Sequence, residues 1–209
     1  MIVTISRQFA AGGSEVARQV AEALGYALVD TELIDEVARR AGMSREEVAD
    51  REERAPGFID RLTHILAASM PEFVAPEGGT LPDLTEERLV RITEKVVAEL
   101  AEQGRVVLVG RAAPAVLARR ADALHVRIVA PVEARLRRAV ERLGVASKDA
   151  ERKLMETDAN RARYHKQYYR KDWNDAVNYD LVVNTERLGI EGAVAAIMAV
   201  VGGSGGSGR

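Results

Sequence analysis

Residues 2–15 read IVTISRQFAAGGSE, and this stretch decides the fold. Its first four residues are apolar or β-branched, which is typical of a buried strand, and the apolar spacing over residues 16–24 predicts a helix directly after it. Between the two, Gly12 and Gly13 allow the backbone to approach a ligand closely. The amides of such a turn and the positive end of the following helix are suited to binding phosphate. The same residues are also consistent with an ordinary strand-to-helix turn in which Ser14 caps the helix.

The stretch matches the phosphate-loop motif G-x-x-x-x-G-K-[ST] only in part. Gly12 and Ser14 match, whereas Arg7 stands at the first glycine and Gly13 at the lysine. The motif's hydroxyl residue contacts phosphate oxygens or Mg²⁺, so Ser14 is the candidate metal ligand. The motif alone favours the ordinary turn. The position of the stretch after the first strand favours phosphate binding, because nucleotide-binding α/β proteins carry their phosphate loop there.

Short apolar runs alternate with amphipathic helical patterns along the chain. The expected strands are residues 2–5, 27–29, 106–109, 125–129 and 181–183. This alternation predicts an α/β fold with a parallel sheet and helices on both faces, in which ligands bind beyond the carboxyl ends of the strands. Residues 43–84 interrupt the alternation and are interpreted as an inserted helical subdomain, and residues 202–209 have the composition of a flexible Gly/Ser tail.

The composition sets the broad class of protein. A length of 209 residues fits one domain, which we place at residues 1–201. The 30 basic and 32 acidic residues give a net charge of −2, so we expect neither nucleic acid nor membrane as a partner. The chain has no cysteine, no apolar run long enough to span a membrane and no signal-peptide pattern at its start. We therefore expect a cytoplasmic protein.

Polar residues follow two of the expected strands at their carboxyl ends. Asp30 comes directly after residues 27–29, and Gly110 and Arg111 come after residues 106–109. An arginine in this place offers a planar fork that suits a phosphate group, and the glycine allows a sharp exit from the strand. The alternatives are that Asp30 caps the next helix and that Arg111 forms a surface ion pair.

Residues 131–175 are rich in arginine and tyrosine and are interpreted as a lid over the site. Arginines on a closing lid stabilise the charge of a phosphoryl group in transfer. At helical spacing the segment carries two groups of side chains, which are Arg135, Arg138 and Arg142, and then Asp158, Arg161, Tyr164, His165 and Tyr168. The tyrosines either stack on a base or pack the lid, and the alternative for the whole segment is a solvated charged helix.

Taken together, these stretches resemble the cytidylate-kinase-like family of P-loop nucleoside monophosphate kinases. The resemblance lies in IVTISRQFAAGGSE (2–15), LGYALVDTELI (24–34), VVLVGRAAPAVL (106–117), TDANRARYHKQYY (157–169) and NYDLVVNTERLGIEGAV (178–194). It covers most of residues 1–200 and is weakest at 43–84. It implies a three-layer P-loop kinase-type sandwich with a five-stranded parallel sheet, in which residues 43–84 bind the monophosphate.

The resemblance also implies ATP as the phosphate donor, Mg²⁺ as the metal and a (d)CMP-like pyrimidine monophosphate as the acceptor. The candidate donor-binding residues are Arg7, Gly12, Gly13, Ser14 and Glu15. The candidate acceptor-binding residues are Asp30, Gly110, Arg111, Tyr164 and Tyr168. The candidate catalytic residues are Arg111, Arg135, Arg138, Asp158 and Arg161.

One departure from the motif bears on activity. The lysine that normally reaches the β- and γ-phosphates is replaced by Gly13, and losing this cation slows phosphoryl transfer unless Arg7, Arg135 or Arg138 takes its place. The first hypothesis is therefore a kinase, and the second is a nucleotide-binding regulator without phosphoryl transfer. A third hypothesis is an interaction protein that uses its tyrosine-rich helix as an interface.

Overall fold

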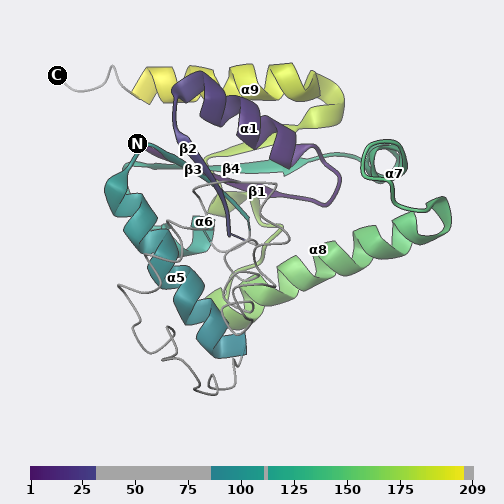
Figure 1. Ribbon diagram of the computed structural model, residues 1–209, viewed down its shortest axis with the longest axis horizontal. Helices are drawn as coiled ribbons and strands as arrows, with labels where there is room; N and C mark the ends of the chain where they lie inside the picture. The colour runs from purple at the N-terminus through teal and green to yellow at the C-terminus, as the bar shows by residue number, and fades with distance from the viewer. Residues whose placement is uncertain (32–85, 111–112, 205–209) are drawn as a thin grey trace, which may run out of the picture.

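One all-parallel sheet forms the centre of the molecule (Figure 1). Its strands lie in the order β2-β3-β1-β4-β5. The computed structural model describes residues 1–31, 86–110 and 113–204. The strands are β1 (Ile2–Arg7), β2 (Ala27–Asp30), β3 (Val106–Val109), β4 (Ala123–Val129) and β5 (Leu181–Asn184). The predicted fold class is confirmed. The central strand β1 extends two residues beyond the prediction because Ser6 and Arg7 continue to pair with β4.

Helices cover both faces of this sheet, as Figure 1 shows. Their bounds are α1 (Gly13–Leu24), α5 (Glu86–Gln103), α6 (Ala113–Val116), α7 (Val132–Glu141), α8 (Ser147–Tyr169) and α9 (Thr185–Ser204). One face packs Val3 and Ile5 against α1 and α9, and the other packs Ile2 and Leu108 against α5. This arrangement gives three layers. The period-2 alternation of β1 sends its odd-numbered side chains, including Arg7, toward α1.

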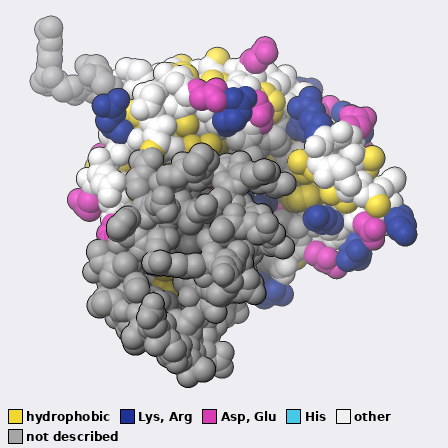
Figure 2. Space-filling model, viewed as in Figure 1, with side chains coloured by type: hydrophobic (Ala, Val, Ile, Leu, Met, Phe, Trp, Pro, Cys, Tyr) yellow, Lys and Arg dark blue, Asp and Glu magenta, His cyan; other side chains and the backbone are white. Residues whose placement is uncertain are grey.

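The predicted insertion at 43–84 and Arg111 lie outside the described residues. The tail was expected to begin at 202, but α9 continues through Ser204, because the backbone hydrogen bonds of a helix propagate past its last apolar side chain. Within the described ranges, no helix combines the length and apolarity that a membrane span requires. On the face seen in Figure 2, basic and acidic side chains are interspersed on the described surface.

The register of the sheet brings the candidate residues together at the carboxyl ends of the strands. Ile5 and Asp30 both pair with Val109, and Arg7 pairs with Ile128, so β1, β2 and β3 end side by side. The first residue after β3 stays attached to β1, since the amide of Gly110 donates to the Ile5 carbonyl at 3.0 Å. Parallel strands place their carboxyl ends on the same side, which is where ligands of such sheets bind.

A buried arginine fastens the chain after α8 to this sheet. Arg127 of β4 is 3% exposed, and its guanidinium donates to the Trp173 carbonyl, the Tyr179 hydroxyl (3.1 Å) and the Asn174 side chain (2.8 Å). Its Cζ atom lies 4.0 Å from the centre of the Trp173 ring. The Trp173 indole in turn donates to Ser6 Oγ at 2.9 Å. These contacts hold the end of α8 against β1 and β4.

Replacing this guanidinium should destabilise the protein. We expect Arg127→Met to lower the free energy of unfolding by about 1–3 kcal/mol, because it leaves buried acceptors without a donor. Arg137→Met is the matched control, since Arg137 is exposed and pairs with Glu186 at the surface, and such pairs contribute at most about 1 kcal/mol. Urea denaturation measures both. Equal losses in the two variants would contradict a special role for Arg127.

Candidate functional site

The turn between β1 and α1 presents an uncapped helix N-terminus. The N-cap is Gly12, with φ +82°, and no side chain caps it among the described residues. The alternative in which Ser14 caps the helix is therefore wrong, because a left-handed glycine takes the cap position and leaves Ser14 exposed in the first turn. The first hydrogen bond of the helix runs from Val16 to the Gly12 carbonyl at 3.0 Å. The amides of residues 13–15 precede it and face outward, where the helix dipole favours an anion.

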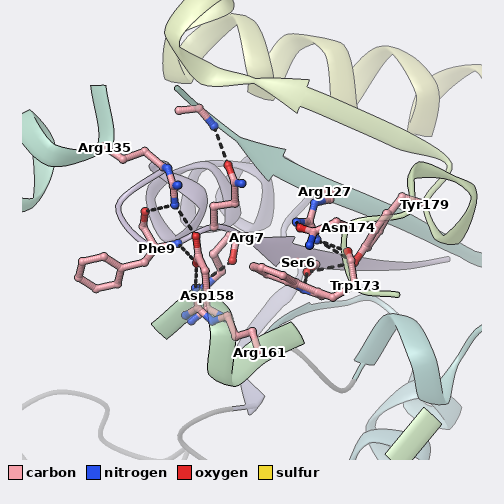
Figure 3. Close-up of polar contacts among 12 residues, drawn as sticks. Ser6, Arg7, Phe9, Arg127, Arg135, Asp158, Arg161, Trp173, Asn174 and Tyr179 are labelled. Atoms are coloured by element: carbon pink, nitrogen blue, oxygen red, sulfur yellow. Dashed lines mark hydrogen bonds and ion pairs between the residues drawn. The ribbon is translucent and has the colours of Figure 1, made fainter. Parts of the chain in front are cut away.

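Side chains from late in the chain bind alternate carbonyls of this turn (Figure 3). Arg161 of α8 donates to the Arg7 carbonyl at 2.9 Å, and Arg135 of α7 donates to the Phe9 carbonyl at 3.3 Å. The Ala11 carbonyl accepts from the Thr185 hydroxyl at 2.7 Å and from Arg138 at 3.5 Å. Three predicted lid arginines therefore meet at the turn.

These contacts orient the amides of the turn. In a trans peptide the carbonyl and the next residue's N–H point in opposite directions. Binding of the Phe9 and Ala11 carbonyls therefore directs the amide of Ala10 away from Arg135 and the amide of Gly12 away from Thr185 and Arg138. The arginines of α7 and α8 therefore stabilise the shape of the turn through its backbone.

Asp158 connects the turn to both helices of the predicted lid. Its carboxylate accepts from the Phe9 amide at 2.8 Å and from Arg135 at 2.5 Å, and it lies 3.9 Å from Arg161. Its side chain is 17% exposed, so these charge-assisted contacts are only weakly screened by solvent. Asp158 thus acts on the turn through the backbone of Phe9.

A second group of candidates lies beside the turn at the ends of β2 and β3. Arg7 Nη2 lies 3.0 Å from Asp30 Oδ2, so this carboxylate pairs with an arginine of the central strand. Gly110 has φ +135°, and a Cβ built on it would lie 2.0 Å from Thr31 Oγ1. Glycine is therefore required there. Thr31, which sequence reasoning missed, is 1% exposed, and among the described residues its hydroxyl has no hydrogen-bond partner.

Glu15 and the tyrosines, which were predicted to bind ligands, lie in different surroundings. Glu15 accepts from Arg18 at 2.6 Å and Gln19 at 2.8 Å, and these bonds hold its pKa below the usual range. Tyr164 is 5% exposed and packs with Val90 of α5 and with Val116, which favours packing within the chain over an interface with another protein. Contact of Tyr164 and Tyr168 with a base stays a prediction.

The turn therefore brings together several predicted site residues, which are Gly12, Gly13, Asp158 and the three arginines of the predicted lid. Arg7 connects this group to Asp30 and Gly110. Thr185 also belongs to this group but was not predicted, because a threonine that begins a helix usually acts as its cap. Within the described part of the chain, no group of three or more His, Asp or Glu side chains is placed to hold a metal ion.

The five-stranded parallel sheet with helices on both faces is a fold of the P-loop kinase class. A model of the cytidylate kinase-like family matches residues 2–187, and the chain belongs to this family. It is 25% identical over 202 residues to a cytidylate kinase of Pyrococcus horikoshii, covering 96% of this chain and 88% of that protein. It is 30% identical over 150 residues to a cytidylate kinase of Methanocaldococcus jannaschii, covering 67% of this chain and 83% of that protein.

Solved structures agree with this fold. An uncharacterized protein from Eubacterium ventriosum superposes with a TM-score of 0.69 at 22% identity, over 96% of this chain and 98% of that one. Shikimate kinase from Bacteroides thetaiotaomicron gives 0.53 at 14% identity, over 96% and 98%. Family and fold together support a kinase-like phosphotransferase activity.

Removing the Asp158 carboxylate should loosen the turn. We expect Asp158→Ala to speed hydrogen exchange at the Phe9 amide by about tenfold to a hundredfold, because a hydrogen bond to a charged group contributes roughly 1.5–3 kcal/mol. Asp158→Asn keeps an acceptor oxygen and should fall between wild type and Asp158→Ala. Hydrogen–deuterium exchange of peptides covering residues 7–12 measures the effect.

The control is Asp149→Ala in the same helix, where an exposed carboxylate pairs with Arg152 at 2.9 Å. It should leave exchange in the turn unchanged, since surface pairs contribute little. Exchange at Phe9 that is the same in Asp158→Ala and wild type would contradict the role assigned to Asp158.

Proposed function

We propose that this chain transfers the γ-phosphate of ATP to a pyrimidine nucleoside monophosphate resembling (d)CMP. The observation that carries the proposal is the uncapped N-terminus of α1, bordered by Arg135, Arg138 and Arg161. Relatives named cytidylate kinase, which the chain matches over most of their length, support cytosine as the acceptor base.

The donor phosphates fit the turn at residues 7–14. Outward amides at a helix N-terminus, a left-handed glycine and nearby arginines are the groups that bind phosphate oxygens. The exposed hydroxyl of Ser14 would hold Mg²⁺ together with phosphate oxygens, and the ion would neutralise charge on the transferred group.

The acceptor side comprises Asp30 and Gly110, which lie at the strand ends next to the turn, and Arg111, which follows Gly110 in the sequence. An oxygen of the acceptor phosphate forms a bond to the γ-phosphorus, and the bond from that phosphorus to the β–γ bridging oxygen breaks. The electron pair leaves with the bridging oxygen, which gives ADP and a nucleoside diphosphate. The reaction requires no covalent enzyme intermediate, so the protein contributes positioning and charge stabilisation.

A second candidate function is nucleotide binding without phosphoryl transfer. The observation that favours it is Gly13 in the place of the motif's lysine. The two functions share the same turn and differ only in turnover. They are separated by measuring nucleoside diphosphate formation from MgATP and a panel of nucleoside monophosphates. Product with CMP or dCMP supports the kinase, and a nucleotide-dependent rise in Tm without product supports the regulator.

Gly12 provides a sharper test of the phosphate site. We expect Gly12→Ala to abolish or strongly weaken ATP binding, because a side chain at φ +82° strains the turn and its Cβ would lie 2.6 Å from Ile190 Cδ1. Isothermal titration calorimetry with ATP measures the change.

Gly25→Ala is the matched control. Gly25 caps the other end of α1 with φ +64° and has no atom near its missing Cβ, so its variant suffers comparable backbone strain away from the turn. We expect a similar loss of stability, roughly 1–2 kcal/mol, in both variants but wild-type ATP affinity in Gly25→Ala. Equal ATP affinity in both variants would sink the assignment of the turn.

A further inference from the structure

Position 13 has no room for a side chain. A Cβ built on Gly13 would lie 2.4 Å from Arg7 Cβ and 3.0 Å from Arg7 Cγ, closer than real Cβ atoms approach. Positive φ does not explain this glycine, since Gly13 is absent from the positive-φ residues of the described chain. The stem of Arg7 therefore makes glycine necessary at the position where the phosphate-loop motif has its lysine.

The same arginine carries its charge toward the acceptor side. Its stem passes beside the N-terminus of α1, and its Nη1 atom lies 3.5 Å from a Cβ built on Gly110 at the end of β3. Asp30 at the end of β2 orients the other edge of the guanidinium at 3.0 Å, and the side chain of Arg7 is only 8% exposed. A planar guanidinium in this place suits the oxygens of a phosphoryl group.

The other arginines at the turn bind its backbone carbonyls. Arg135, Arg138 and Arg161 donate to the carbonyls of Phe9, Ala11 and Arg7, so each of these guanidinium groups already contacts the backbone of the turn. Among the described residues at the turn, Arg7 is thus the cation that extends from the donor-binding helix end to the strand ends of the acceptor side.

We propose that Arg7 is the catalytic cation that replaces the missing lysine, and that an arginine at position 7 and a lysine at position 13 exclude each other. The inference rests on the proposed kinase function. As the acceptor oxygen bonds to the γ-phosphorus and the bridging oxygen leaves with its electron pair, the Arg7 guanidinium stabilises the charge on the equatorial oxygens. Gly13 is the steric consequence of that placement.

The steric exclusion is tested by stability alone. We expect Gly13→Ala to lower Tm by roughly 2–10 °C in the wild-type background, because it overpacks a closed site. In the Arg7→Gly background, which removes both contacting atoms, the same substitution should leave Tm unchanged or raise it. Equal losses of Tm in the two backgrounds would overturn the exclusion.

The catalytic role is tested by moving the cation. We expect Arg7→Gly to lower kcat with MgATP and CMP about 100-fold or more, and the double variant Arg7→Gly/Gly13→Lys to recover at least about tenfold of that loss. Arg7→Ala/Gly13→Lys is the control and should not recover, because alanine keeps the Cβ that blocks position 13. A purely structural role of Arg7 would give no recovery with a lysine placed on another element.

ATP affinity, measured by calorimetry on the same variants, separates this inference from the proposed function. If the wild-type protein forms no product with any monophosphate, the kinase proposal and the catalytic role fail together, and loss of ATP affinity in Arg7→Gly with recovery in the double variant still assigns Arg7 as the phosphate-binding cation that replaces the lysine. Wild-type kcat and ATP affinity in Arg7→Gly would overturn the inference. So would a folded double variant that matches Arg7→Gly in both measurements.

Discussion

The structure depends on the opposite directions of carbonyl and amide in each peptide unit of the turn after β1. Side chains from α7, α8 and α9 bind the carbonyls of Arg7, Phe9 and Ala11, so the amides that follow them point away. The amide of Gln8 donates to Ile128 of β4 at 3.0 Å, and those of Ala10 and Gly12 point away from the side chains that bind the preceding carbonyls. Among the described residues no side chain caps the helix, and the shape of the turn is set by guanidinium and hydroxyl groups that lie more than a hundred residues away in sequence.

This arrangement explains why the second half of the chain is needed for a site that begins at residue 7. β4 leads into α7 and β5 leads into α9, and the sheet order puts both strands on the same side of β1. α8 runs back across the turn, and Arg127, stacked on Trp173, fixes the chain that follows it. The charged residues of α8 thus fall into two groups. Asp158 and Arg161 bind the backbone of the turn after β1, while Arg152 and Glu156 pair at the surface. The alternative of a wholly solvated charged helix is wrong for the half of α8 that contacts the turn.

Local sequence patterns were enough to predict the strands, the parallel sheet and the strand ends at which Arg7, Asp30 and Gly110 meet. An apolar run and the residues that follow it are neighbours in the sequence, so both can be recognised without knowledge of the fold. The cap of α1 was not predictable in this way. A glycine at positive φ and a glycine that makes space look alike in sequence, and Gly12 and Gly13 are one of each. Contacts such as Phe9 with Asp158 or Ser6 with Trp173 could not be predicted from the sequence either, since they depend on where α8 and the chain after it lie relative to β1. The packing of Tyr164 against Val90 and Val116 was not predictable for the same reason, because it depends on how α8 lies against α5 and α6.

The two departures from the phosphate-loop motif are physically one. Arg7 stands where the motif has its first glycine, Gly13 stands where it has its lysine, and the atoms of these two residues compete for the same space. If the two departures were independent, the chain would have lost two parts of the motif, which would favour a protein that binds nucleotide without phosphoryl transfer. If they are one exchange, the number of cations at the turn is unchanged, and one positive charge has moved from α1 to β1. A missing lysine then argues against catalysis only if the guanidinium that excludes it is directed away from the phosphates. Arg7 instead passes the N-terminus of α1 and ends beside Asp30 and Gly110, so the exchange favours the kinase over the regulator.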